Sequence, residues 1–322
     1  MSYTVLKKHK SFGGATIFCE HHSESTKTKM NFSAFLPKNI EEVESAVIWL
    51  SGLTCNEENF ITKAGVQAHL AGTNTMVICP DTSPRGQNIP GEDDSYDFGS
   101  GAGFYLNATR QPWAPHYRMY DYVVNELPAL IEAHFPVTQQ RAISGHSMGG
   151  RNAMTFGSRY PEKLQKLIIV DVGPDFDPRG SQRISQEIID VPEEFDSFEA
   201  VVEYMTKQNR FASDSVIRRR LTYSTKLLSN GKIGWKYDLV IREQRRQGTV
   251  PPSQDLWPEI PKITCPTLIV RGMDTDVLAA EVAQRMVDVM PNAQITEIPQ
   301  AGHMVFEDNP SDFNTAVGAF LR

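Results

Sequence analysis

A Gly-x-Ser-x-Gly motif near the middle of the chain constrains the fold more than any other feature of the sequence. It lies in the segment Ser144-Gly145-His146-Ser147-Met148-Gly149-Gly150. In such a motif the chain leaves a strand, turns sharply and enters a helix, so the serine points into a cleft. Both glycines are needed because a side chain at either place would strike the neighbouring strand or helix. The motif therefore predicts a strand–turn–helix unit with Ser147 as a nucleophile.

The residues on either side favour this interpretation over an ordinary glycine turn. Residues 139–144 read as a short strand, and residues 151–156 are compatible with a helix that closes at Tyr160-Pro161. A bare Gly-x-Ser-x-Gly occurs by chance in many chains, so the strand before it and the helix after it are the supporting signal.

Length and composition limit the classes of protein to consider. A chain of 322 residues favours one sheet domain with an inserted subdomain. The net charge is −7 and neither half of the chain is basic, which argues against a nucleic-acid partner. No apolar run approaches a membrane span and the N-terminus lacks the apolar core of a signal peptide, so we expect a cytoplasmic protein with no membrane partner. The scattered cysteines lack metal spacing and are expected to be free, buried thiols: Cys19, Cys55, Cys79 and Cys265.

The first half reads as strands, a long loop and a helix. The expected strands are 12–18, 30–36, 46–50 and 75–80. The segment 81–113 is rich in glycine, aspartate and aromatic residues, and an irregular segment of this length is usually functional. A helix is expected over 117–135, with Pro128 kinking it or ending its first part.

The residues after strand 46–50 are candidates for an oxyanion hole. Gly52 would let the backbone turn its N–H groups toward Ser147, and the N–H after the nucleophile would complete the hole. Leu53 and Met148 are then the candidate donors. A plain strand-to-helix turn is the alternative interpretation of this segment.

A series of motifs in the first half resembles the S-formylglutathione hydrolase (esterase D) family from about residue 11 to Gly150. The motifs occur in this order: Ser51-Gly52-Leu53-Thr54-Cys55, Pro80-Asp81-Thr82-Ser83-Pro84-Arg85-Gly86, Gly91-Glu92-Asp93-Asp94, Asp97-Phe98-Gly99, Gly101-Ala102-Gly103-Phe104-Tyr105, Tyr117-Arg118-Met119-Tyr120 and the Ser147 motif itself. The resemblance implies an α/β-hydrolase fold and a serine thioesterase that also cleaves small activated esters. It assigns Ser147 as nucleophile, with Leu53 and Met148 as oxyanion donors. One departure is the strand before the motif, which looks about one residue short and only weakly apolar.

The second half, about residues 151–322, resembles instead the cap-bearing α/β-hydrolases of the esterase and lactonase type. Its marks are Asp171-Val172-Gly173-Pro174, Arg271-Gly272 followed by Asp274 and Asp276, and Ala301-Gly302-His303. Strands are expected at 166–170, 266–272 and 294–299, and a helix at 279–290. Residues from about 175 to 258 read as helical and charged, at the place where hydrolases of this fold carry a cap.

The chain therefore looks like a mosaic of two families joined at the Ser147 motif, whether natural, engineered or an artefact of fusion. We expect an α/β fold, the α/β-hydrolase fold, with a mostly parallel sheet, helices on both faces and a helical cap. The expected organisation is a core in two parts, 1–174 and 259–322, separated by a cap at 175–258.

A serine nucleophile needs a base and the base needs an orienting carboxylate. His303 is the one histidine after Ser147, and it follows the last expected strand. Asp171, Asp276 and Asp274 all follow strands at the same sheet edge, so each is a candidate acid. Most members of the superfamily that this half resembles take the acid from the loop after the seventh strand, here 266–272, whereas some capped esterases use an Asp-x-x-Pro motif 24 residues past the serine. Asp171 has that spacing and is favoured, then Asp276, then Asp274; a helix N-cap is the alternative role for the others.

The expected activity is hydrolysis of carboxylic esters or thioesters by a serine enzyme, with S-formylglutathione as the best single substrate. A capped carboxylesterase or lactonase is the alternative, and a catalytically impaired recombinant or a binding-only member of the fold also stays open. No metal cluster, nucleotide loop or flavin motif is visible, so we expect no cofactor and no metal. The expected partner is a small-molecule ester or thioester, and a homodimer stays open.

Overall fold

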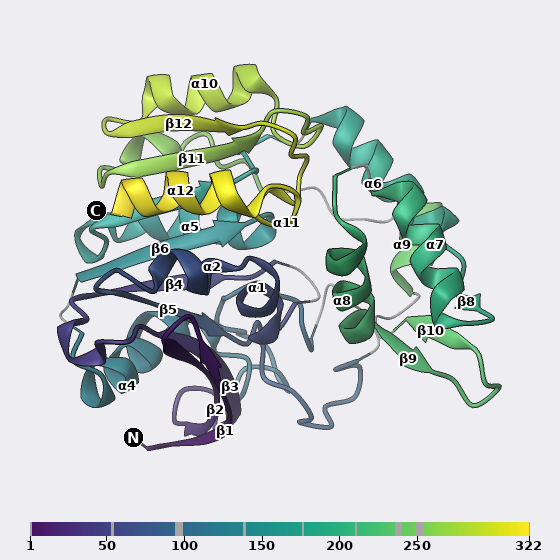
Figure 1. Cartoon of the computed structure of the whole chain (residues 1–322), viewed down its shortest axis with the longest axis horizontal. Helices are drawn as coiled ribbons and strands as arrows, with labels where there is room; N and C mark the ends of the chain where they lie inside the picture. The colour runs from purple at the N-terminus through teal and green to yellow at the C-terminus, as the bar shows by residue number, and fades with distance from the viewer. Residues whose placement is uncertain are drawn as a thin grey trace.

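The computed structural model describes residues 2–52, 55–93, 99–137, 140–175, 177–209, 211–235, 240–248 and 254–321. A nine-stranded sheet with the order β1-β2-β3-β5-β4-β6-β7-β11-β12 forms its centre (Figure 1). The strands are β1 (Tyr3–Ser11), β2 (Gly14–Ser23), β3 (Thr28–Leu36), β4 (Ser45–Leu50), β5 (Thr75–Pro80), β6 (Gln140–His146), β7 (Lys166–Val170), β11 (Thr267–Gly272) and β12 (Ala293–Ile298).

Six neighbouring strands, from β5 through β4, β6, β7 and β11 to β12, are parallel. The first three strands pair antiparallel and join the parallel part where β3 meets β5. The strand before Ser147, β6, pairs with β4 residue by residue from Gln140 opposite Ser45 to Gly145 opposite Leu50. The mostly parallel α/β-hydrolase sheet expected from the sequence is therefore present.

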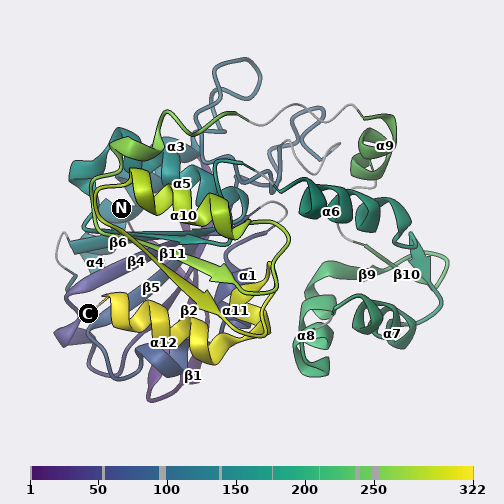
Figure 2. The same cartoon turned by 90° about the horizontal axis from the view of Figure 1, so that it is seen from above.

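Helices cover both faces of this sheet, and each layer encloses its own hydrophobic core (Figure 2). On one face pack α3 (Met119–Asp121), α4 (Leu127–His134), α5 (Met148–Arg159) and α10 (Ala280–Val289); on the other pack α1 (Glu58–Lys63), α2 (Val66–Leu70), α11 (Val305–Asp308) and α12 (Pro310–Leu321). Short 3₁₀ turns occupy Ile40–Glu42, Pro161–Lys163 and Ile260–Lys262. Two cores back to back explain why the central strands read as continuous apolar runs.

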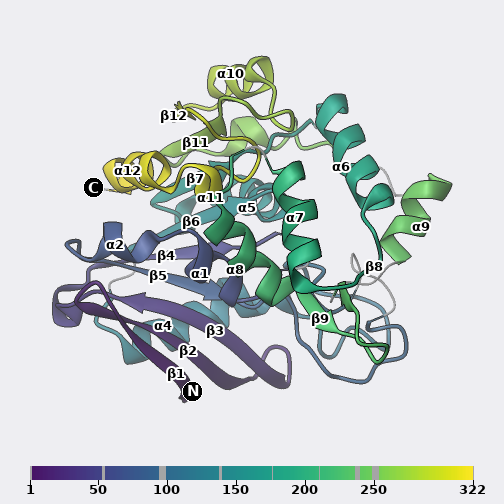
Figure 3. The ribbon, with the colours of Figure 1, turned by 45° about the vertical axis from the view of Figure 1, so that its right-hand side comes forward.

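A third group of elements lies between β7 and β11 in the chain, and we call it the cap. It consists of α6 (Pro178–Asp190), β8 (Glu194–Phe195), α7 (Phe198–Gln208), α8 (Asp214–Ser224), β9 (Thr225–Leu227), β10 (Ile233–Trp235) and α9 (Val240–Gln247). Asp177, Ser197 and Ser213 accept backbone N–H bonds at the starts of α6, α7 and α8, which is the usual role of these residue types. The cap has a hydrophobic cluster of its own, and Figure 3 shows α8 in front of α1 and α11.

Three expectations differ from the structure. The strand expected from Phe12 begins at Gly14, because Phe12 and Gly13 form the turn of a hairpin with φ values of 47° and 82°. Strand β1 was not among the expected strands, because its residues are polar, lysine-rich and exposed at the sheet edge. The cap, expected to be helical, also holds the three-stranded sheet β8-β10-β9.

Other local features agree with the sequence more closely. The helix expected over 117–135 runs as α3, a π-helical turn at Tyr122–Glu126 and α4, and the change to α-helix comes at Leu127, next to Pro128. All four cysteines are free, and all but the half-buried Cys55 are buried. In the described ranges, no helix combines the length and the apolar character needed to cross a membrane.

Candidate active site

Ser147 lies at the sharp turn between β6 and α5, with φ 54° and ψ −124°. A positive φ is unfavourable for a residue with a side chain and persists only where the surrounding structure imposes it. Here β6 is held in the middle of the sheet and α5 is packed against it, so the turn between them has no room to relax. The strand–turn–helix unit expected from the motif is present.

The glycines of the motif lie where no side chain fits. A Cβ on Gly145 would come within 2.3 Å of the Gly149 carbonyl oxygen, and a Cβ on Gly149 within 2.1 Å of the Leu50 carbonyl oxygen. Gly150 is similarly close to Val172, whose side chain would lie 2.5 Å from the added atom. The expectation that side chains here would strike the neighbouring strand or helix is confirmed.

These contacts predict that Gly149→Ala destabilises the protein. The methyl group would meet a backbone oxygen of β4, which cannot rotate away, and overpacking of this kind costs about 1–3 kcal/mol. Thermal unfolding should show a lower melting temperature. Gly318→Ala in α12 is the matched control, because no described atom outside its own helical backbone lies within 4 Å of the added Cβ, and removing a helical glycine stabilises by up to about 1 kcal/mol. Equal stabilities of the two variants would contradict the prediction.

His303 and Asp171 meet across the carboxyl ends of β12 and β7. His303 Nδ1 lies 2.9 Å from Asp171 Oδ2, so the ring donates its Nδ1–H to the carboxylate. Asp171 is fully buried and adopts a φ of 48° directly after β7. Two further donors hold its carboxylate: the Gly272 backbone N–H at 3.0 Å from Oδ1 and the Thr275 hydroxyl at 2.6 Å from Oδ2. We call Ser147, Asp171 and His303 the candidate triad.

The structure places the other two candidate aspartates elsewhere. Asp276 forms an ion pair with Arg183 of the cap, with Arg183 Nη2 at 2.8 Å from Oδ1, and this partner lowers the pKa of the carboxyl. Asp274 is exposed, and its backbone N–H donates to the Ala301 carbonyl at 3.0 Å. Neither caps α10, whose N-cap residue is Ala279, so the alternative role expected for them is wrong. Of the three aspartates, Asp171 is the one hydrogen-bonded to the imidazole of His303.

His146, the last residue of β6, connects the strand before Ser147 to the loop that holds His303. Its Nε2 lies 3.0 Å from the His303 carbonyl oxygen and the two ring centroids are 4.5 Å apart. Burial, and then the nearby His303, lower the pKa of His146 well below its ordinary value, so this ring stays neutral at pH 7. His146 was not among the candidate site residues, although a histidine next to Ser147 is a visible signal in the sequence.

Of the two candidate oxyanion donors, the structure describes Met148. Met148 begins α5, so its backbone N–H lies at the positive end of that helix. Leu53 lies outside the described residues. Gly52 is described, and a Cβ there would come within 3.6 Å of Ser147 Cβ, so the start of the loop after β4 lies against Ser147. The hydroxyl of Tyr105 anchors this loop by donating to the Ser51 carbonyl at 3.0 Å.

The cap reaches the residues that follow His303. Glu307 of α11 is buried between two cations, Lys63 of α1 at 3.5 Å and Arg220 of α8 at 3.6 Å. Asp308 Oδ2 accepts the Gly302 N–H at 2.9 Å, and burial raises the pKa of this carboxyl to about 6. The cap therefore borders the candidate triad.

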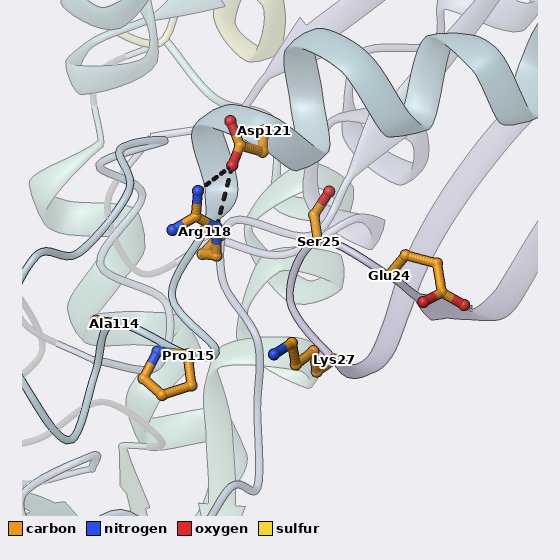
Figure 4. A pocket seen from close by; sticks show the side chains of 7 residues that line it. All are labelled: Glu24, Ser25, Lys27, Ala114, Pro115, Arg118 and Asp121. Atoms are coloured by element: carbon orange, nitrogen blue, oxygen red, sulfur yellow. Dashed lines mark hydrogen bonds and ion pairs between the residues drawn. The ribbon is translucent and has the colours of Figure 1, made fainter.

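A pocket of about 460 Å³ lies between the β2–β3 turn and residues 114–121, and none of the candidate triad lines it (Figure 4). Its lining includes Lys27 and Arg118, but Arg118 is paired with Asp121, with Nε 3.1 Å from Oδ2.

Within the described ranges, no group of three histidine, cysteine or acidic residues is placed to hold a metal ion.

Comparisons with known proteins find relatives of both kinds suggested by the motifs. The family described as "Putative esterase" matches residues 23–171. An S-formylglutathione hydrolase from Agrobacterium tumefaciens is 26% identical with a TM-score of 0.63, and the match covers 99% of each chain. An α/β hydrolase from Novosphingobium aromaticivorans is 22% identical with a TM-score of 0.65, covering 94% of this chain and 97% of that one. An esterase from Mycobacterium tuberculosis is 17% identical with a TM-score of 0.61, covering 99% of this chain and 92% of that one.

These matches confirm the resemblance to S-formylglutathione hydrolase and to other α/β esterases and hydrolases. They also confirm the α/β-hydrolase fold. The esterase family match over the first half, together with the neighbours along the whole chain, supports an ester hydrolase.

Proposed function

We propose that this α/β-hydrolase cleaves carboxylic esters or thioesters through an acyl-enzyme on Ser147. The observation that carries the proposal is the 2.9 Å contact between His303 Nδ1 and the buried carboxylate of Asp171, in a chain whose nucleophile turn is intact. A carboxylate on Nδ1 holds the imidazole in the tautomer whose Nε2 is free to accept a proton. That tautomer is the one a serine nucleophile requires.

In the proposed mechanism Ser147 Oγ attacks the acyl carbon while His303 Nε2 takes the hydroxyl proton. Asp171 stabilises the resulting imidazolium, and the backbone N–H groups of Met148 and Leu53 stabilise the oxyanion. His303 then protonates the leaving alcohol or thiol, which departs and leaves the acyl group on Ser147. A water molecule, deprotonated by His303, attacks the acyl-enzyme and releases the acid.

S-formylglutathione is the single substrate that we favour, and a wider range of ester substrates is the alternative. The proposal of S-formylglutathione is supported by the family motifs up to Gly150 and by the Agrobacterium tumefaciens enzyme among the structural neighbours. The alternative, a capped carboxylesterase or lactonase, is supported by the cap that borders His303 through Arg220 and Glu307. That cap belongs to the half of the chain without the S-formylglutathione hydrolase motifs, so it would shape the acyl pocket differently.

We therefore expect measurable cleavage of short p-nitrophenyl esters, with lower selectivity for the glutathione thioester than a whole family member has. The measurement is kcat/KM for p-nitrophenyl acetate and for S-formylglutathione on the same preparation, with an authentic S-formylglutathione hydrolase as the matched control. A preference for the thioester as strong as that of the control enzyme would show that the cap does not alter selectivity. Hydrolysis of neither substrate would argue for an impaired or binding-only protein.

A further inference from the structure

The carboxylate of Asp171 has a hydroxyl neighbour in the loop after β11. The hydroxyl of Thr275 donates to Asp171 Oδ2 at 2.6 Å, and this oxygen is the one that accepts the Nδ1–H of His303 at 2.9 Å. The Gly272 N–H occupies the other oxygen, Oδ1, at 3.0 Å. Thr275, like Asp171, is buried, so water competes little for these bonds.

The orientation of the Thr275 hydroxyl is itself determined by the loop. Its oxygen accepts the backbone N–H of Val277 at 3.1 Å, while its one proton goes to Asp171. The hydroxyl thus joins the loop after β11 to the carboxylate after β7. A carboxylate held by donors on both oxygens cannot rotate about its terminal bond without breaking at least one of them.

We infer that Thr275 is a positioning residue, which orients the Asp171 carboxylate toward His303 and limits how strongly it attracts the Nδ1 proton. The inference rests on the proposed function, with Asp171 as the acid of the triad. A donor on a carboxylate oxygen withdraws negative charge from it, so the imidazolium form of His303 is stabilised less than it would be by a carboxylate without that donor.

Other ionisable groups also face the imidazole and must be kept constant in a test. The His146 ring lies 4.5 Å away, centroid to centroid, and Asp308 accepts the N–H of neighbouring Gly302. Asp276, paired with Arg183, also acts on the site through its charge. Asp308 matters most, because burial raises the pKa of its carboxyl to about 6, close to the range in which a histidine titrates.

The test compares Thr275→Val, which removes the hydroxyl and keeps the shape, with Thr275→Ser, which keeps the hydroxyl. Thr267→Val is the matched control: Thr267 is a buried threonine at the other end of β11, and its hydroxyl donates to the Cys265 carbonyl at 3.0 Å. Each variant is assayed on p-nitrophenyl acetate over a range of pH, and its melting temperature is measured.

For Thr275→Val we expect kcat to fall about tenfold with little change in KM, less than the hundredfold that a 1 Å misplacement can cost. The acid limb of kcat/KM should move to higher pH, and should do so equally when Asp308→Asn is present. Thr275→Ser should restore both kcat and the wild-type position of the acid limb. Thr267→Val should lower the melting temperature alone.

Either of two kinetic results would overturn the inference: an unchanged acid limb in Thr275→Val, or a loss of kcat that Thr267→Val reproduces. The titration of the His303 ring by NMR, assigned with His303→Gln, gives a readout that needs no activity. An upward shift of its midpoint in Thr275→Val supports the role of Thr275 even if the wild-type protein cleaves no ester, and an unchanged midpoint refutes it. A wild-type protein without esterase activity would then count against the proposed function alone.

Discussion

Replacing Ser147 with alanine is expected to abolish both ester cleavage and labelling by a fluorophosphonate probe. The probe and the substrate need the same oxygen nucleophile, and removal of such a serine costs on the order of 10⁶-fold in kcat. The variant should still fold, because the glycines around the turn and the pairing of β6 are unchanged. The measurements are p-nitrophenyl acetate hydrolysis and gel detection of the labelled protein.

Ser144→Ala is the matched control for this experiment. Ser144 lies on β6, three residues before Ser147, and is buried, and its hydroxyl has no hydrogen-bond partner among the described residues. Its removal should therefore leave labelling unchanged. Undiminished labelling of Ser147→Ala would show that another residue is the nucleophile, whereas an unlabelled wild type would indicate a binding-only protein.

Asp171→Asn is expected to lower kcat by about 10⁴-fold. The amide cannot accept the Nδ1–H as a carboxylate does, so the imidazole takes the wrong tautomer and its protonated form is no longer stabilised. Asp276→Asn should retain most of the activity, since it breaks a partly exposed ion pair with Arg183 and costs about 1 kcal/mol or less of stability. The measurement is kcat of both variants on one ester, with circular dichroism to show that each is folded.

The reverse outcome would be equally informative. An inactive Asp276→Asn beside an active Asp171→Asn would mean that the loop after β11 supplies the acid. His303 would then have to leave its contact with Asp171 during catalysis, and the inferred role of Thr275 would also be lost.

Much of the fold could be predicted because it depends on local patterns. The parallel strands β4, β5, β7 and β11 appear as short apolar runs, since each is buried between two helical layers, and the turn at Ser147 appears in its glycines. The edge strand β1 could not be predicted in this way, because most of its side chains are exposed and show no apolar pattern. The strand is defined by its backbone pairing with β2. The small sheet of the cap has strands of two or three residues, too short to show a period.

Local sequence was enough to predict the turn at Ser147 and the place of His303 after the last strand, because both depend on residues adjacent in the chain. It left three aspartates as candidate acids, since all three follow strands that end at one edge of the sheet. Only the tertiary structure distinguished them. The pairing of β7 with β11 sets Val170 beside Val270 and so brings Asp171 next to the Gly272 N–H and the Thr275 hydroxyl. Asp276 instead forms an ion pair with Arg183 of the cap. Which carboxylate reaches His303 is a matter of distances between chain segments about 100 residues apart or more, and no local pattern encodes them.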